Sequence, residues 1–252
     1  GQVRGQRRVF FFIVGHGPLL SRTMAAMRRA LRVIGVIVLV LVVALAALWA
    51  GLSHSATATA PGPEAEALAH EMVRAVDGDG WSRTGAVRWR VMGRAHLWDR
   101  QRGLARVEWH GNRVLLDVNS RKGRAWHKGV ELADGKDKDK LLQSAYALWI
   151  NDSFWLNPVV KAFDDGTTRA RGTVGSRRAL EVSYASGGLT PGDRYLWILD
   201  ENARPVAWRI WVKIVPIRGL EFTWEGWTRL GTGAWVATSH KVVGLDAVRL
   251  VD

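Results

Sequence analysis

Histidine and acidic side chains are the first candidates for chemistry in this chain, and their spacing argues against a metal site. The seven histidines show neither an HxH nor an HxxxH spacing, which would place two imidazoles on one zinc ion. His96 and Asp99 form the most suggestive pair, but residues three apart on a β-strand point to opposite faces. We therefore expect no metal and no other cofactor.

Two acidic clusters are better explained as turns than as sites. Asp164-Asp165 stands directly before Gly166, an order typical of a chain reversal. The segment 77–80, Asp-Gly-Asp-Gly, resembles a calcium loop but lacks the downstream glutamate that completes an EF-hand. Neither cluster predicts catalysis.

Nucleophile and phosphate-loop motifs are also missing from the sequence. It contains no Gly-x-Ser-x-Gly and no Walker-type loop. It has no cysteine, which excludes a thiol nucleophile, a Cys-ligated zinc and a lipidated N-terminal cysteine. We predict that the protein is not an enzyme; a hydrolase with dispersed active-site residues is the remaining catalytic alternative.

Positive charge is concentrated at the N-terminus. The chain of 252 residues has a formal net charge of +13, but its first 60 residues hold seven arginines and no acid. The remainder holds 29 basic and 23 acidic residues, and most of the basic ones are spread among acids. A nucleic-acid partner is not expected, because such proteins cluster their basic residues on one patch.

A targeting segment precedes the domain that would carry any function. Residues 33–52 contain no charged group and are long enough to cross a membrane as a helix. Arg28, Arg29 and Arg32 stand immediately before them, which predicts that the chain after the segment lies outside the cytoplasm.

Two fates of this segment remain open. The apolar run exceeds the 7–15 residues typical of a signal peptide, yet Ala-Thr-Ala occurs twice within residues 56–60 and forms an acceptable cleavage site. The domain is thus expected to be periplasmic, or anchored in the inner membrane through residues 33–52 if they are not cleaved. We divide the chain into an upstream extension or disordered segment at 1–26, the signal peptide or anchor at 27–60, and a domain at 61–252.

Alternating apolar and polar residues predict that the domain is mainly antiparallel β. A helix is expected over 64–76, followed by about ten strands. Helical insertions are expected at 141–149 and 154–163, after a charged loop at 134–140. Since no helix lies between most consecutive strands, their pairing should be antiparallel.

Tryptophan is unusually frequent, with fourteen in the chain and thirteen of them after residue 60. Several lie on the apolar phase of predicted strands. They could form a bulky core, or a concave sheet face wide enough to hold an apolar ligand. The predicted ligand-binding surface comprises Val87, Trp89, Val107, Trp109, Trp208, Ile210, Phe222 and Trp224.

Element order and short motifs resemble a known superfamily. The motifs are His96-Leu97-Trp98-Asp99, Phe154-Trp155-Leu156, Phe163-Asp164-Asp165-Gly166 and Gly192-Asp193. Over residues 68–250 the chain resembles the outer-membrane lipoprotein carriers and acceptors (LolA/LolB-like), in an uncharacterised branch. The resemblance implies an incomplete β-barrel wrapped around helices, with an apolar cavity that takes acyl chains. The long N-terminal apolar segment departs from a freely diffusing carrier.

Two functions follow as expectations. The first is an export-side binding protein for a lipid or acylated ligand, acting in envelope lipid or lipoprotein handling. The second is a membrane-anchored structural or sensory module that packs against an envelope protein partner and binds no small molecule.

Overall fold

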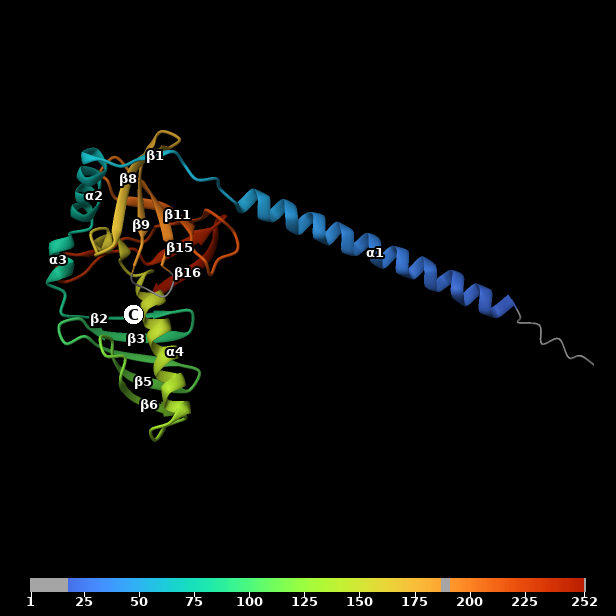
Figure 1. Ribbon diagram of the computed structural model, residues 1–252, viewed down its shortest axis with the longest axis horizontal. Helices are drawn as coiled ribbons and strands as arrows, with labels where there is room; N and C mark the ends of the chain where they lie inside the picture. The colour runs from blue at the N-terminus through green and yellow to red at the C-terminus, as the bar shows by residue number, and fades with distance from the viewer. Residues whose placement is uncertain (1–17, 187–190, 252) are drawn as a thin grey trace, which may run out of the picture. The chain divides into compact units, whose positions relative to one another are not determined.

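The computed structural model describes residues 18–186 and 191–251, and the chain divides into two compact units, Gly1–Gly51 and Leu52–Asp252 (Figure 1). The first unit, in its described part, is helix α1 (Pro18–Leu52). Within α1, Arg29–Leu52 has a mean hydropathy of 3.1 and none of its side chains is buried. Twenty-four helical residues extend about 36 Å, enough to cross the hydrocarbon core of a bilayer.

Helix α1 begins within the segment 1–26 that was expected to be an upstream extension or disordered. Residues 18–26 are helical and continue into the apolar helix. The remaining part of that expectation, residues 1–17, lies outside the described residues. The apolar run at 33–52 is confirmed as one helix, compatible with either a signal sequence or a membrane anchor.

The second unit contains an eight-stranded antiparallel sheet in the order β15-β16-β2-β3-β4-β5-β6-β7. Its strands are β2 (Ala86–Val91), β3 (Arg94–Asp99), β4 (Leu104–Trp109), β5 (Asn112–Asp117), β6 (Gly123–His127), β7 (Val130–Glu131), β15 (Ser239–Val242) and β16 (Leu245–Val251). Consecutive strands pair with one another from β2 to β7, as the alternating sequence predicts.

A six-stranded antiparallel sheet has the order β1-β8-β9-β10-β11-β12. Its strands are β1 (Thr59–Ala60), β8 (Thr167–Val174), β9 (Arg177–Tyr184), β10 (Asp193–Leu199), β11 (Pro205–Trp211) and β12 (Leu220–Thr223); β13 (Thr228–Arg229) and β14 (Trp235–Val236) form a separate pair. An antiparallel bridge between Glu225 and Ser239 links the chain after β12 to β15. The sheets remain open. The described residues form sixteen strands, more than the predicted ten, and four of these strands (β1, β7, β13 and β14) have only two residues each.

Helices in this unit are α2 (Pro63–Ala75), α3 (Gly78–Ser82), α4 (Lys136–Ser153) and the 3-10 turn η1 (Pro158–Lys161). The expected charged loop is wrong from Lys136 onward, because Asp137 and Asp139 occupy the first turn of α4, where the helix dipole favours acids. The second predicted helix is only η1. The expected turn at 77–80 is instead the start of α3, capped by Asp77, whose side chain accepts from Gly80 N–H at 2.8 Å.

A two-residue turn joins β4 to β5. Trp109 pairs with Asn112, so the two turn residues are His110 and Gly111. Both have positive φ, 44° and 78°, as a type I′ turn requires. A glycine at the second position tolerates this conformation, whereas the histidine before it is held there by the twist of the two strands.

Two buried clusters make up the core. The first joins α2 and η1 to β9–β11 and includes Leu68, Met72, Trp197 and Trp208. The second joins α4 to the eight-stranded sheet, where α4 contacts β4, β5 and β6 (Figure 1). Trp155, in the segment between α4 and η1, packs against both clusters.

Residues that follow the apolar helix are built into the second unit. His54 N–H donates to Arg218 O, and His54 Nδ1 lies within hydrogen-bonding distance of Gly219 O, both at 3.0 Å. A Cβ on Gly219, whose φ is +69°, would lie 2.5 Å from the carbonyl oxygen of His54. Thr59–Ala60 forms β1 on the edge of the six-stranded sheet. The compact unit therefore begins at Leu52, whereas the sequence places its start at residue 61.

A shortened chain that begins at Pro61 should be less stable than one that begins at Leu52. It lacks β1 and the hydrogen bonds of His54, so its free energy of unfolding should fall by about 1–3 kcal/mol. Urea unfolding followed by tryptophan fluorescence measures the difference. Equal stabilities would contradict the docking of residues 53–60.

Candidate functional site

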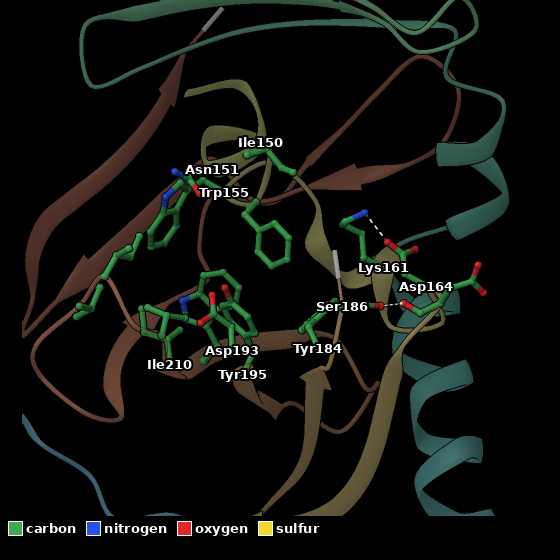
Figure 2. A pocket seen from close by; sticks show the side chains of 16 residues that line it. Ile150, Asn151, Trp155, Lys161, Asp164, Tyr184, Ser186, Asp193, Tyr195 and Ile210 are labelled. Atoms are coloured by element: carbon green, nitrogen blue, oxygen red, sulfur yellow. Dashed lines mark hydrogen bonds and ion pairs between the residues drawn. The ribbon is translucent and has the colours of Figure 1, made fainter. Parts of the chain in front are cut away.

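One cavity of about 220 Å³ combines an apolar wall with a polar rim. It lies between the segment that follows α4 and one face of the six-stranded sheet (Figure 2). Ile150 comes from the end of α4, Phe154 and Trp155 from the segment after it, and Val212 and Ile214 from the chain after β11. The cavity exists because this segment stands off the sheet instead of packing flat on it.

Aromatic rings form most of the wall. The centroid of Phe154 lies 5.8 Å from that of Tyr184 and 5.3 Å from that of Tyr195, and the two tyrosines are 5.6 Å apart at 90°. Trp208 is 4.9 Å from Tyr195 and 5.3 Å from Trp155. Such edge and tilted contacts give a rigid, largely apolar surface.

Register explains why the two tyrosines share the wall. Tyr195 on β10 stands opposite Val182 on β9, and Tyr184 stands opposite Asp193. Residues two apart on a strand face the same side of the sheet, so Val182 and Tyr184 face the same side, as do Asp193 and Tyr195. The alternation in the sequence thus places both tyrosine rings against Phe154. We call Phe154 and Trp155, which follow α4, the roof segment of the cavity.

The rim is polar and holds more acids than bases. Lys161 forms an ion pair with Asp164, and Ser186 Oγ donates to Asp165 O at 3.3 Å (Figure 2). Asp193 is buried and accepts from Lys213 N–H at 3.3 Å. The expected turn at 164–166 is therefore also part of a cavity rim, which its sequence does not reveal.

Burial keeps both tyrosines in their neutral form. It raises the pKa of Tyr184 and of Tyr195 far above the ordinary value, and neighbouring acidic groups add to the effect. Trp208 contributes an indole N–H that is buried without a hydrogen-bond partner among the described residues. The wall can offer hydrogen-bond donors, but it offers no ionised nucleophile or base.

A buried polar network holds the end of α4, from which the cavity roof departs. Asp152, 3% exposed, accepts from Arg94 Nε at 2.6 Å and from Arg94 Nη2 at 2.8 Å, and its Oδ2 lies 2.8 Å from His96 Nε2. His96 stacks on Trp89 with centroids 4.6 Å apart. Arg94, His96 and Asp152 include the histidine and aspartate of a serine-hydrolase triad. The described residues place no hydroxyl nucleophile in hydrogen-bond contact with His96, so we assign a structural role to these three residues.

His240 fixes the next part of the roof. Its Nδ1 lies 3.1 Å from Thr223 O and its Nε2 3.2 Å from Trp155 O, while the ring stands 4.4 Å from that of Trp224. Burial lowers the pKa of His240 to about 4, although the two carbonyl groups act in the opposite direction. The ring is therefore neutral near pH 7 and donates to only one of the two carbonyl oxygens.

The structure divides the eight predicted ligand-binding residues between the two clusters. Trp208, Ile210, Phe222 and Trp224 belong to the first, whereas Val87, Trp89 and Val107 belong to the second and Trp109 packs against it. Of the eight, only Trp208 and Ile210 line the cavity. The expectation of one concave surface is wrong because α4 covers the eight-stranded sheet and fills that part of the face.

Strand β11 stops at Trp211, and Ile214, which is 67% exposed, lies in the turn that follows. Phe154, Tyr184 and Tyr195 were missed as site residues, although the strand phase of the two tyrosines and the aromatic type of all three are visible in the sequence. The sequence does not show that the segment after α4 passes over the two tyrosines.

His96 and Asp99 do have separate partners, as their spacing predicts. His96 contacts Asp152 on the buried side, and Asp99 pairs with Arg102 at 2.6 Å on the exposed side. Throughout residues 18–186 and 191–251, no three His, Cys, Asp or Glu side chains converge on a point that could hold a metal ion.

No model of a known protein family matches this chain, and no curated protein sequence matches it.

Stability should fall on acidification between pH 6.5 and 4, because the unfolded chain then protonates His240 while the folded chain does not. The loss should reach about 3 kcal/mol below pH 4, and no contribution from this group is expected above pH 7. His240→Gln keeps a donor but does not titrate, so its urea-unfolding free energy should vary less across that window. Parallel pH profiles for parent and variant would contradict the assignment.

Proposed function

We propose that the unit after the membrane helix binds a lipid or an acylated ligand on the outer side of the inner membrane, with the apolar end of the ligand in the aromatic cavity. The observation that carries the proposal is the open space lined by the rings of Phe154, Tyr184 and Tyr195. A core that served stability alone would close such a space, since voids lose dispersion contacts.

Cavity size limits the ligand. A volume of 220 Å³ is below the about 300 Å³ at the lower end of ordinary small-molecule pockets. The cavity therefore accommodates the end of one acyl chain or a single ring, not a whole lipid. The polar rim of Lys161, Asp164 and Asp193 would stay with the headgroup at the mouth.

Support for a carrier-like fold comes from the connection between the sheets. The bridge from Glu225 to Ser239 joins two open antiparallel sheets, and helices α2 and α4 contact strands of the two sheets. This arrangement is in keeping with an incomplete barrel around helices, as in the LolA/LolB-like superfamily. Membership of that superfamily, and a role in envelope lipid or lipoprotein handling, are parts of the proposal.

We further infer that the N-terminal helix stays attached as an anchor. Cleavage near Ala56, Ala58 or Ala60 would remove His54, whose hydrogen bonds belong to the folded unit. Only Ser53 separates the helix from His54, so an uncleaved chain would tether the folded unit to the bilayer. A binding site that cannot diffuse would exchange its ligand with the membrane or with a neighbouring protein.

A second candidate function is a membrane-anchored structural or sensory module with an envelope protein partner. The observation that favours it is the filled face of the eight-stranded sheet, where Leu142, Ala145 and Trp149 of α4 pack on the strands. Ligand uptake decides between the two functions.

Val212→Trp should block uptake of a fluorescent fatty acid. Val212 is half-buried and lines the cavity, so the larger ring would occupy the space that the acyl end takes. We expect the dissociation constant to rise about tenfold or more, equivalent to about 1.4 kcal/mol. Val174→Trp, a half-buried site at the end of β8 away from the cavity lining, is the matched control and should bind like the parent. If the parent protein shows no saturable uptake of the fatty acid, the lipid-binding proposal is wrong and the structural or sensory module is favoured.

Retention of the anchor is tested by the mass of the chain recovered from membranes. We expect the mature protein to include residues 33–52, and a periplasm-active reporter fused after residue 252 to be functional, because Arg28, Arg29 and Arg32 hold the other end in the cytoplasm. A mature chain that begins between residues 57 and 61 would refute the anchor.

A further inference from the structure

One loop of the folded unit is held close to the point where the apolar helix ends. Leu52 is both the last residue of α1 and the first residue of the second unit. His54 follows two positions later, so their Cα atoms are at most about 7.6 Å apart. The main-chain N–H of His54 donates to Arg218 O, and its Nδ1 lies 3.0 Å from Gly219 O. The loop between β11 and β12, residues 212–219, therefore lies close to Leu52.

This loop presents an apolar side chain flanked by positive charge. Ile214 is 67% exposed. Lys213 and Arg218 are also exposed, and neither side chain forms an ion pair among the residues that the structure describes. Glu221, which follows on β12, is already paired with Arg209 at 2.8 Å. The exposed part of the loop is thus apolar and basic.

A second exposed apolar group is the turn between β15 and β16. Val243 and Leu245 are 74% and 75% exposed. Val242 pairs with Leu245, so Val243 and Gly244 form a two-residue turn, with φ of 51° and 77°. A β-branched residue is disfavoured in this left-handed conformation, for which asparagine is a common choice. Neither burial nor backbone preference accounts for a valine at this tip.

Strand pairing brings the loop and the turn toward the same end of the unit. Thr223 Oγ1 accepts from Lys241 N–H at 3.0 Å, and Glu225 forms an antiparallel bridge with Ser239. β15 therefore runs antiparallel beside β12, and the turn that follows β15 lies toward the beginning of β12. That beginning is joined directly to the loop 212–219.

We propose that the loop and the turn dock on the outer surface of the bilayer that α1 crosses. Ile214, Val243 and Leu245 enter the interfacial layer, where their apolar side chains leave water, and Lys213 and Arg218 meet anionic headgroups. The inference rests on the proposed retention of the anchor, because a helix that crosses the bilayer ends at its surface. Since Ile214 also lines the aromatic cavity, its insertion places one edge of that cavity at the lipid surface.

Site-specific fluorescence of the full chain in lipid nanodiscs tests the docking. The sequence contains no cysteine, so Ile214→Cys and Val243→Cys each provide a single site for an environment-sensitive label. Val130→Cys is the control, because Val130 is 68% exposed and β7 lies at the opposite edge of the sheet from β15. In nanodiscs of phosphatidylcholine and phosphatidylglycerol, a spin-labelled lipid should quench positions 214 and 243 about twofold more strongly than position 130, and iodide should quench them less.

A charge variant tests the choice of an anionic surface. Lys213→Gln with Arg218→Gln should lower lipid quenching of a label at position 243 in these nanodiscs. It should have little effect where phosphatidylcholine is the only lipid, because the attraction depends on the charge of phosphatidylglycerol. Lys122→Gln with Arg177→Gln removes the same charge from exposed positions elsewhere in the unit and should be quenched like the parent.

Three results would overturn the proposal. Labels at positions 214 and 243 that respond to both quenchers as position 130 does would refute the docking. Labels shielded from iodide but not quenched by lipid would show that protein, such as a second copy of this chain, covers the patch. Equal lipid quenching in the charge variant and the parent would refute the anionic surface. Each result is independent of anchor cleavage in the cell, because the reconstituted chain contains α1.

Discussion

The carboxylate of Asp152 is the group on which the arrangement of both cores depends. It lies buried in the last turn of α4, where the helix dipole disfavours a negative charge. Arg94 and His96 on β3 supply the donors that make this position tolerable. Loss of one partner from such a network leaves an uncompensated buried charge, at a cost of about 3–5 kcal/mol. Asp152 therefore fixes both the register of α4 on the sheet and the point at which the chain leaves the helix.

The position of the roof segment depends on where the chain leaves α4. Phe154 and Trp155 come directly after the pinned turn, and the carbonyl oxygen of Trp155 lies within hydrogen-bonding distance of His240 on β15. Trp155 then contacts Trp208 and Phe222 of the six-stranded sheet. One short segment thus joins the two clusters and also stands off the strands that carry Tyr184 and Tyr195. A roof held at both ends can span an open space without collapsing into it.

The two faces of the eight-stranded sheet differ in what covers them. Its inner face is filled by α4, so the tryptophans there contribute to stability rather than to a ligand surface. On its outer face Arg113 and Arg124 lie over the ring of Trp126, and Arg124 also forms an ion pair with Glu131. The six-stranded sheet, by contrast, is covered only in part by α2 and η1, and its uncovered part is where the cavity opens.

The sequence by itself determined the elements with a strong period. The apolar helix, the helix at 63–75, the antiparallel strands and their inward tryptophans follow from spacing alone, because a period of two or of 3.6 fixes which side chains share a face. It also established that His96 and Asp99 point apart. It could not show that Trp89 and Trp208 belong to different clusters, since alternation gives the same phase whether a helix or a cavity lies above.

Only the tertiary structure decided where the open space lies. Asp152 pairs with residues 56 and 58 positions away, and His240 with a carbonyl group 85 positions away, so no local pattern encodes either contact. The docking of residues 53–60 depends in the same way on Arg218 and Gly219. Periodicity assigns each residue to a face, but which faces meet, and which remain apart, is set by long-range pairs of buried polar groups that must satisfy one another.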